Sequence, residues 1–336
     1  MRAAVVGSGG WGTALALLLL GNGNEATLIC RREDKCRQMM ECRENPQLSG
    51  VHLPEGLKLT CDMNEASECD LVVLATPSFS VRETARRLNS CLSDGTVLVC
   101  VSKGIEKESS LLLHQVIEQE IDERIPVAVL SGPSHAEEVA RGIPTAVVVA
   151  SENQHAAELT QDLFMNERFR IYTSSDVIGV EVGGAMKNVI AMCAGCCDGL
   201  GLGDNTKAML MTRGITEIAR LGVALGAKAE TFTGLAGIGD LIVTCTSVHS
   251  RNYRAGRMIG QGVSVRDAVS GMNGAVVEGY YAAANARALA QKTGVDMPIT
   301  EGAYQVLYEG KYPDIVLTEL MSRKKRQEPE GEMSWI

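Results

Sequence analysis

Short, nearly continuous apolar runs alternate with longer helical patterns from the N-terminus to about residue 173. Such runs are typical of strands covered on both faces, and their alternation with helices predicts βαβ units and a mostly parallel sheet. Eight strands are predicted, at Ala3–Val6, Ala26–Cys30, Leu57–Cys61, Leu71–Ala75, Val97–Val101, Val127–Leu130, Thr145–Ala150 and Phe169–Tyr172. We therefore expect a doubly wound α/β domain over residues 1–178.

The pattern changes after about Asp176, where the strand signals fade. Long segments rich in Ala, Leu and Met predict helices at Val177–Cys197, Lys207–Leu225 and Val276–Lys292. Pro298 and Pro313 are each placed to open a further helix. We expect an all-α second domain over residues 179–322, followed by a charged, partly disordered tail at residues 323–336.

Length and charge narrow the class of protein. A chain of 336 residues favours about two domains. Its 32 Lys and Arg against 41 Asp and Glu give a net charge of −9, which is the wrong sign for nucleic-acid binding. The longest strongly apolar stretch, Ala14–Leu20, is far shorter than the roughly 20 residues that span a bilayer, and no cleavable signal is apparent. We expect a cytoplasmic protein without membrane insertion.

Eleven cysteines without regular spacing favour free thiols in a reducing compartment. The group Cys193, Cys196 and Cys197 has no second pair and no nearby His in sequence, so it is a poor zinc signal. Small apolar side chains in a buried helix explain it better. No metal site is expected.

The segment Gly7-Ser8-Gly9-Gly10-Trp11-Gly12 follows a predicted strand and opens an apolar helix. This is the context in which a GxGxxG pattern indicates a Rossmann-like dinucleotide site. Gly7 would permit a tight turn, Gly9 would let a pyrophosphate approach the backbone, and Gly12 would let helix pack on strand. The alternative is a purely structural glycine loop.

The end of the second predicted strand carries Arg31 and Arg32, where an NAD-binding fold usually has Asp or Glu. Because a guanidinium offers a planar fork to phosphate oxygens, this pair favours NADP(H), while NAD(H) stays possible. Glu33 and Asp34 follow directly and could instead be surface partners of the same arginines.

Other strand ends are also polar or rich in Gly and Pro, and ligands of such sheets bind beyond the carboxyl ends of the strands. These ends are Thr76-Pro77-Ser78, Ser102-Lys103-Gly104 and Ser131-Gly132-Pro133-Ser134-His135. We expect them to line one crevice. Lys103 is expected there rather than on the solvated surface.

Lys187 lies beside Asn188 inside an otherwise apolar, Gly-rich helical stretch. A buried ammonium is costly unless it is paired or its pKa falls. Lys103 as a second cation would lower that pKa toward the range useful for proton transfer. The alternative is that Lys187 extends its ammonium to the surface.

Downstream, Gly234, Gly237 and Gly239 predict a loop with unusual dihedral angles. If a helix starts near Gly239, Asp240 and Thr244 share one face, where both could point at a ligand. Asp240 could instead be only an N-cap. Arg251 and Asn252, which follow Ser250, offer a cation and an amide to a small phosphate or carboxylate, unless they merely start a surface helix.

Taken together, GSGGWGTALA, SGPSHAEE, GAMKNVIA, GLAGIGDLIVTCTS and SRNYRAG, in this spacing, closely resemble NAD(P)-dependent glycerol-3-phosphate dehydrogenases over residues 1 to about 320. The resemblance implies reversible hydride transfer between dihydroxyacetone phosphate and sn-glycerol 3-phosphate, supplying glycerophospholipid synthesis. It implies Lys187 as proton donor and acceptor, with Lys103, Asp240 and Thr244 as its polar surroundings.

The motifs and the resemblance together imply two sets of binding residues. The expected substrate contacts are Lys103, Gly132, Ser134, Lys187, Asp240, Ser250, Arg251 and Asn252. The expected cofactor contacts are Gly7, Ser8, Gly9, Gly10, Trp11, Gly12, Arg31, Arg32, Pro77, Lys103, Ala136, Arg251, Val276 and Glu278. Ala136, Val276 and Glu278 rest on the resemblance alone.

Two other functions remain open on the residues themselves. One is a β-hydroxyacid dehydrogenase whose cation grips a carboxylate, and the other is a noncatalytic NADP(H) sensor. Lys187, Asp240 and Arg251 argue against the sensor, which needs no proton relay. Apolar helices in the second domain could form a self-complementary face, so a homodimer is expected.

Overall fold

The computed structural model describes residues 1–272 and 276–325 and contains one eight-stranded sheet. Its strands are β1 (Arg2–Val6), β2 (Glu25–Ile29), β3 (Lys58–Thr60), β4 (Leu71–Leu74), β5 (Val97–Cys100), β6 (Val127–Ser131), β7 (Thr145–Ala150) and β8 (Phe169–Ser174). Their order is β3-β2-β1-β4-β5-β6-β7-β8. All neighbours are parallel except β6 and β7, which are antiparallel. The eight predicted strands and the mostly parallel sheet are confirmed.

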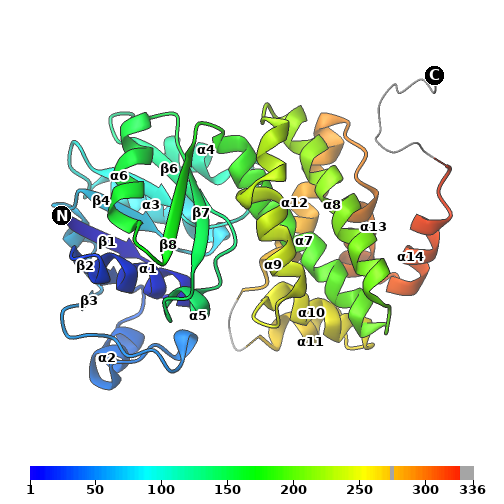
Figure 1. Cartoon of the computed structure of the whole chain (residues 1–336), viewed down its shortest axis with the longest axis horizontal. Coiled ribbons are helices and arrows are strands. Elements are labelled where there is room, and N and C mark those ends of the chain that lie inside the picture. Colours follow the sequence, from blue (N-terminus) through cyan, green and yellow to red (C-terminus); the bar gives the residue numbers. More distant parts are fainter. Residues whose placement is uncertain (273–275, 326–336) are drawn as a thin grey trace.

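Helices cover both faces of this sheet, as a doubly wound fold requires (Figure 1). They are α1 (Gly10–Gly21), α2 (Glu33–Cys42), α3 (Val81–Asn89), α4 (Leu113–Glu118), α5 (Ala136–Val139) and α6 (Gln154–Phe164), with short 3₁₀ turns at Pro46–Leu48, Met63–Ala66 and Ser78–Ser80. Leu15 of α1 and Phe164 of α6 belong to one apolar core, whereas Leu88 of α3 and Ile117 of α4 belong to another. Successive strand side chains alternate between these cores, which explains why the strands are apolar throughout. We call residues 1–174 the sheet half.

The rest of the described chain is helical, and we call residues 177–325 the helical half. It contains α7 (Val177–Gly199), α8 (Asp204–Ala224), α9 (Asp240–Thr246), α10 (Arg251–Gly260), α11 (Val265–Ser270), α12 (Glu278–Thr293), α13 (Pro298–Glu309) and α14 (Pro313–Met321). Pro298 and Pro313 are the first residues of α13 and α14, as predicted. Figure 1 shows the sheet half and the helical half side by side, with α14 at the far end of the helical half.

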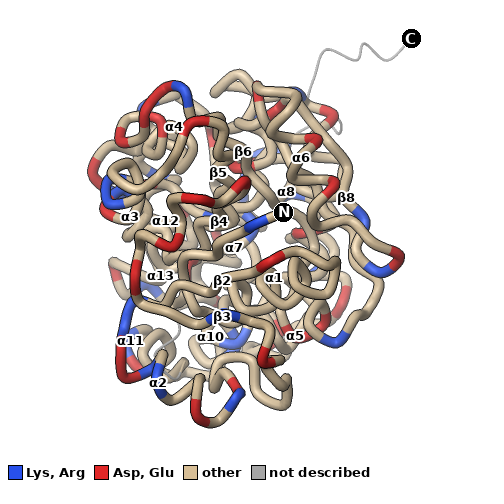
Figure 2. The backbone as a smooth tube through the Cα atoms, turned by 90° about the vertical axis from the view of Figure 1, so that its left-hand side faces the viewer, with Lys and Arg blue, Asp and Glu red and all other residues tan. Residues whose placement is uncertain are grey.

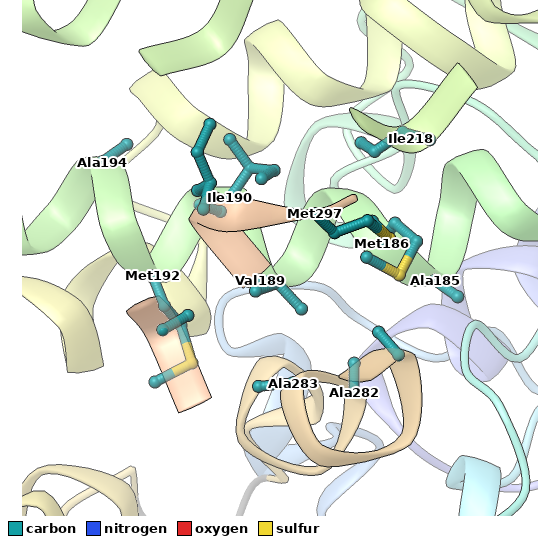
Figure 3. Packing of buried hydrophobic residues seen from close by; sticks show 14 of the residues in the cluster. Ala185, Met186, Val189, Ile190, Met192, Ala194, Ile218, Ala282, Ala283 and Met297 are labelled. Atoms are coloured by element: carbon teal, nitrogen blue, oxygen red, sulfur yellow. The ribbon is translucent and has the colours of Figure 1, made fainter. Parts of the chain in front are cut away.

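Helix α7 is the core of the helical half. Figure 3 shows Met186, Val189 and Ile190 of α7 among Ile218 of α8, Ala282 and Ala283 of α12, and Met297, which directly precedes α13. By length and composition α7 could span a membrane, but 89% of its most apolar window is buried inside the protein. Burial from all sides accounts for an apolar surface around the whole helix, so this composition is explained by the core of the fold.

One local prediction is wrong. The glycines from Gly234 to Gly239 do not form a loop with unusual dihedral angles, because residues Leu235–Gly239 form a turn of π-helix and Gly239 has a helical φ of −62°. Glycine is needed there for space: a side chain at Gly237 would collide with the backbone of Phe232. The predicted disordered tail falls almost entirely on residues 326–336, which lie outside the described residues.

At the end of the molecule that carries the sheet, basic and acidic residues are mixed along the backbone. Figure 2 shows Lys and Arg segments interspersed with Asp and Glu segments there. At this end of the molecule the interspersed charges, like the net charge of −9, do not favour binding of a polyanion.

Candidate active site

The glycine loop lies between β1 and α1, where the sequence predicted it. Gly7 has a φ of +120°, and a side chain there would collide with the carbonyl of Ala75. A side chain at Gly12 would collide with the carbonyl of Gly7 and crowd Ala75. Gly9 differs, because the nearest protein atom to a Cβ there would be 3.9 Å away. The protein thus leaves room above Gly9 for a ligand to approach the backbone.

Ser8 anchors this loop through its buried backbone. Its carbonyl accepts hydrogen bonds from Asn45 Nδ2 at 3.1 Å and Lys35 Nζ at 2.5 Å. Asn45 also donates to Thr13 Oγ1 on α1 at 2.7 Å. Sequence reasoning missed Asn45 and Lys35, because neither lies near the loop in the sequence.

Arg31 and Arg32 follow β2 and are both exposed. Arg32 pairs with Asp34 at 3.5 Å, with both side chains more than half exposed. The surface partner that the sequence suggested for these arginines is therefore present. Such an exposed pair is weak, so it leaves the guanidinium free to turn toward a phosphate.

A buried cluster joins the two halves at the carboxyl ends of the strands. Lys103, after β5, donates to Asp240 Oδ2 at 2.7 Å and to the Gly132 carbonyl at 3.2 Å. Lys187 of α7 donates to Asp240 Oδ1 and, at 2.9 Å, to Thr244 Oγ1. Asp240 and Thr244 lie one turn apart on α9, as predicted, and Gly239 rather than Asp240 is the N-cap.

The surroundings set the protonation of this cluster. Lys187 is only 6% exposed, so its ammonium does not reach the surface. Burial is the main cause that lowers the pKa of Lys187 to about 7; the charge of Asp240 opposes this shift, and the charge of Lys103 adds to it. Burial tends to raise the pKa of Asp240, but the two neighbouring lysines outweigh it and hold that pKa below its usual value. The sequence anticipated the effect of Lys103, but desolvation is the larger cause.

The β6 end supplies the residues around Lys103. Gly132 has a φ of +133°, and its carbonyl accepts from both Lys103 and Ser134 Oγ, the latter at 2.8 Å. Gly184 of α7 packs against this turn, since a Cβ there would lie 2.7 Å from Ser131 Oγ. The glycine in α7 therefore lets the two halves meet beside Lys103.

A second chain of hydrogen bonds extends from Asn188, the residue after Lys187. Asn252 donates to Asn188 Oδ1 at 2.8 Å and accepts from the backbone N–H of Gly279 at 2.9 Å. Ser250 caps α10 by accepting from Tyr253 N–H at 3.2 Å. Arg251, the first residue of α10, keeps an exposed side chain. Asn188 therefore orients Asn252. The sequence placed Asn188 beside Lys187 but gave it no role.

The start of α12 contacts the β4 end. Glu278 accepts from Ser78 N–H at 3.2 Å and from Ser78 Oγ at 2.6 Å, which places it beside Pro77. Burial raises the pKa of Glu278, although the hydrogen bonds from Ser78 oppose that shift. Val276 is partly buried just before α12. Ala136, at the start of α5, lies over the glycine loop, because its Cβ would be 3.7 Å from a Cβ at Gly10.

These residues fit a bound dinucleotide. No side chain among the described residues caps the N-terminus of α1, and its first turn carries no acidic residue. Its N–H groups are therefore available to a pyrophosphate. Two buried hydroxyls at strand ends, Thr76 Oγ1 and Ser131 Oγ, have no hydrogen-bond partner within the described chain. Buried polar atoms without partners are uncommon, and a ligand bound at these strand ends would satisfy them.

A separate open depression of about 690 Å³ lies at the opposite edge of the sheet. It is lined by residues at the starts of strands, including Arg2 and Lys58, which pair with Glu68 and Glu65. Ligands of doubly wound sheets bind at the carboxyl edge, so the chemistry lies with the buried cluster.

The doubly wound sheet carries an open glycine loop, and the helical half brings the buried Lys187 to the carboxyl edge of the same sheet, where Asp240 joins it to Lys103. These features define a dinucleotide-dependent oxidoreductase built from a sheet half and a helical half. Residues 2–157 match the family model for the N-terminus of NAD-dependent glycerol-3-phosphate dehydrogenase, and residues 176–318 match the model for its C-terminus. The chain belongs to this family.

Individual relatives agree. The chain is 53% identical over 330 residues to glycerol-3-phosphate dehydrogenase (NAD(P)+) of Moorella thermoacetica, covering 98% of each chain. It is 52% identical over 328 residues to the protein of the same name from Geobacillus thermodenitrificans, covering 96% of this chain and 95% of that one. The crystal structure of glycerol-3-phosphate dehydrogenase from Coxiella burnetii superposes with a TM-score of 0.92 at 39% identity, covering 96% of this chain and 99% of that one.

Proposed function

We propose that this enzyme interconverts dihydroxyacetone phosphate and sn-glycerol 3-phosphate with NAD(P)H, supplying glycerophospholipid synthesis in the cytoplasm. The observation that carries the reaction is the buried Lys187 ammonium, held by Asp240 and Thr244 where the helical half meets the carboxyl edge of the sheet. Family membership supports the substrate, since the relatives named above act on glycerol 3-phosphate by name.

The nicotinamide supplies hydride to the ketone carbon when bound. Lys187 donates a proton to the ketone oxygen during reduction and takes it back during oxidation, so charge is neutralised as it develops. A pKa of about 7 suits both directions, because the ammonium and the free amine are both populated at neutral pH.

Asp240, Lys103 and Thr244 position that ammonium. Asp240 pairs with both lysines, and its negative charge offsets the repulsion between their two ammonium groups. Thr244 fixes a second direction around Lys187 Nζ by accepting a hydrogen bond from it. The remaining direction around the nitrogen is left for substrate oxygen, since an ammonium has three donors.

Arg251 and Asn252 hold the substrate phosphate in this proposal, with Ser250, Gly132 and Ser134 around it. The Asn252 amide already accepts from Gly279 N–H and donates to Asn188, so it has one N–H left to offer. Arg251 is exposed and supplies the positive charge. Binding energy from the phosphate would fix the ketone in reacting geometry.

The cofactor contacts fall into two groups in this proposal. The glycine loop, with Ser8, Trp11 and Ala136, holds the pyrophosphate, and Arg31 and Arg32 favour NADP(H) over NAD(H). Pro77, Lys103, Arg251, Val276 and Glu278 surround the other end of the dinucleotide. Residues 1–178 would then form the dinucleotide-binding domain and residues 179–322 the helical substrate and catalytic domain, with each domain adding some contacts to the other's ligand.

A homodimer and a reducing compartment complete the proposal. All eleven cysteines are free, as expected of a reducing environment. Burial raises the pKa of Cys196 to about 12 and of Cys197 to about 11, which keeps these thiols unreactive at neutral pH.

The test replaces Lys187 with Met. Lys187→Met should keep its affinity for NADPH while turnover with dihydroxyacetone phosphate falls roughly 100-fold or more, because only the proton donor is lost. Turnover is followed as absorbance at 340 nm with NADPH and NADH separately, and cofactor binding by calorimetry. Lys292→Met, an exposed lysine on α12, is the matched control and should behave as wild type. Near-normal turnover of Lys187→Met would refute the assignment.

A further inference from the structure

Lys35 is a cation that the reaction does not use. It lies in the first turns of α2, only partly exposed, and its ammonium donates to the Ser8 carbonyl at 2.5 Å and to Gln47 Oε1 at 3.0 Å. Both acceptors are neutral, and Lys35 forms no ion pair with a carboxylate anywhere in residues 1–272 and 276–325. Partly buried lysines are normally paired, so this arrangement calls for an anion.

The two acceptors border the dinucleotide loop. Ser8 is part of that loop, and Gln47 lies over its end, since a Cβ at Gly10 would be 2.7 Å from the Gln47 carbonyl and one at Gly9 would be 3.9 Å from Gln47 Oε1. Lys35 therefore holds its ammonium at the edge of the space left open above Gly9.

Positive charge accumulates at this place. Arg31 and Arg32 come one residue after the end of β2, and α2 with Lys35 follows them. Burial lowers the pKa of Lys35, and the charge of Arg32 lowers it further, which means that the two cations feel each other. The N-terminus of α1 adds its own positive potential. Asp34 offsets part of this charge by pairing with Arg32, and a strong anion bound among the cations would offset more of it.

The fold indicates which anion. In a doubly wound domain the residue after the second strand meets the 2′ position of the adenosine ribose, and the pyrophosphate lies at the helix N-terminus. Lys35 reaches from the element after β2 back to the loop, so it lies between these two positions. A 2′-phosphate is close to a dianion at neutral pH.

We propose that Lys35 is a direct ligand of the 2′-phosphate of NADP(H) and a determinant of the discrimination between NADPH and NADH. This rests on the proposed preference for NADP(H). Arg31 and Arg32 are exposed and must be ordered on binding, whereas Lys35 is already fixed by two hydrogen bonds, so it loses less conformational entropy.

The experiment uses the full chain and two nucleotides that differ only in the group concerned, 2′,5′-ADP and 5′-AMP. Lys35→Gln should weaken binding of 2′,5′-ADP by roughly tenfold or more, as loss of a charge-assisted hydrogen bond predicts, and leave 5′-AMP within about twofold. Lys35→Met, which keeps the packing of the stem, should repeat this result. Arg37→Gln removes the same charge from an exposed position on α2 and should leave both nucleotides unchanged. Affinities are measured by calorimetry, and circular dichroism checks folding.

Three outcomes would contradict the proposal. An equal loss for both nucleotides means that Lys35 only supports the loop. If the wild type and both Lys35 variants prefer 2′,5′-ADP over 5′-AMP to the same degree, the proposed role of Lys35 is wrong and the NADP(H) preference still stands. A wild type that binds both nucleotides equally overturns that preference, and this proposal with it.

Discussion

At the scale of single residues, the site is built around one buried ion cluster, formed by Lys103, Asp240 and Lys187. Lys187 and Asp240 are 6% and 0% exposed, yet three charges meet there, two positive and one negative. Desolvation disfavours the Lys187 ammonium, and Asp240 offsets part of that cost, which together bring the pKa of Lys187 to about 7. A group that titrates near the working pH can act as acid in one direction and as base in the other.

The pH dependence of turnover should therefore have opposite slopes in the two directions. Ketone reduction needs the Lys187 ammonium, whose population falls as pH rises through about 7. Alcohol oxidation needs the free amine, whose population rises over the same range. We expect the turnover number for reduction to fall, and that for oxidation to rise, by roughly tenfold per pH unit on the limiting side. Turnover is measured with saturating substrates from pH 5.5 to 9.

Asp240→Asn provides the control for that experiment. Asp240 raises the pKa of Lys187, so removing its charge should move both midpoints to lower pH. Midpoints that stay in place in the variant would mean that another group controls the profile. Parallel slopes in the two directions would exclude Lys187 as the shared acid and base.

At the scale of elements, the contact between α7 and α10 sets the position of the substrate residues. A side chain at Gly195 of α7 would collide with the Tyr253 carbonyl, and one at Gly256 of α10 would collide with the Met192 carbonyl. The backbones thus approach as closely as glycine allows. One turn before the contact between Met192 and Gly256, Asn252 donates a hydrogen bond to Asn188. The close crossing of α7 and α10 therefore helps to position Asn252 in the proposed phosphate site.

Gly256→Ala tests this coupling. The added methyl group should push the two helices apart and lower the free energy of unfolding by roughly 1–3 kcal/mol. It should also raise KM for dihydroxyacetone phosphate more than KM for NADPH, because Asn252 moves relative to Asn188. Chemical denaturation and steady-state kinetics give the two values. Gly21→Ala, at the end of α1 with no atom within 4 Å of the new Cβ, should leave both unchanged. An equally stable Gly256→Ala variant would contradict the close contact.

Sequence patterns predicted the elements that depend on local sequence, but not the features that depend on how those elements pack. Strands such as Leu71–Leu74 are local apolar runs, so periodicity located them within about one residue. The turn at Leu235–Gly239 was misassigned, because glycines that serve close packing and glycines that serve unusual dihedral angles look alike in sequence. The contact of Lys187 with Asp240 was only a hypothesis, since 53 residues separate them and the packing of α7 on α9 decides it.

At the scale of the whole molecule, hydrogen bonds connect the sheet half to the helical half beside the buried Lys103–Asp240–Lys187 cluster. Besides the Lys103–Asp240 and Ser78–Glu278 pairs, Asn285 of α12 donates to the Ile105 carbonyl at 2.7 Å. Each of these contacts involves a residue that follows β4 or β5. The segments that bind ligands in such folds therefore also join the halves, and a bound ligand should stabilise the molecule as a unit.

The contact of His114 with Glu181 adds a pH-dependent part to this junction. Glu181 of α7 accepts from the His114 backbone N–H at 3.0 Å and contacts the imidazole Nδ1 at 2.5 Å. Burial tends to lower the pKa of His114, but the hydrogen bond and charge of Glu181, with smaller effects of Glu118 and Glu152, raise it above its ordinary value. The folded protein thus binds this proton more tightly than the unfolded chain. Its contribution to stability is fully present below a pH of about 6.5 and is lost as pH rises through the folded pKa.

His114→Gln should therefore cost most stability in mildly acid solution. The free energy of unfolding, measured in urea from pH 5.5 to 9, should lie below that of wild type by about 1 kcal/mol at pH 6, and the difference should shrink at alkaline pH. His155→Gln, an exposed histidine on α6, is the control and should match wild type at every pH. A difference that is independent of pH would mean that His114 contributes packing alone. Because Glu181 lies on α7 with Lys187, a pH-dependent difference would show that the protonated imidazole stabilises the contact between α4 and the helix that carries the proposed proton donor.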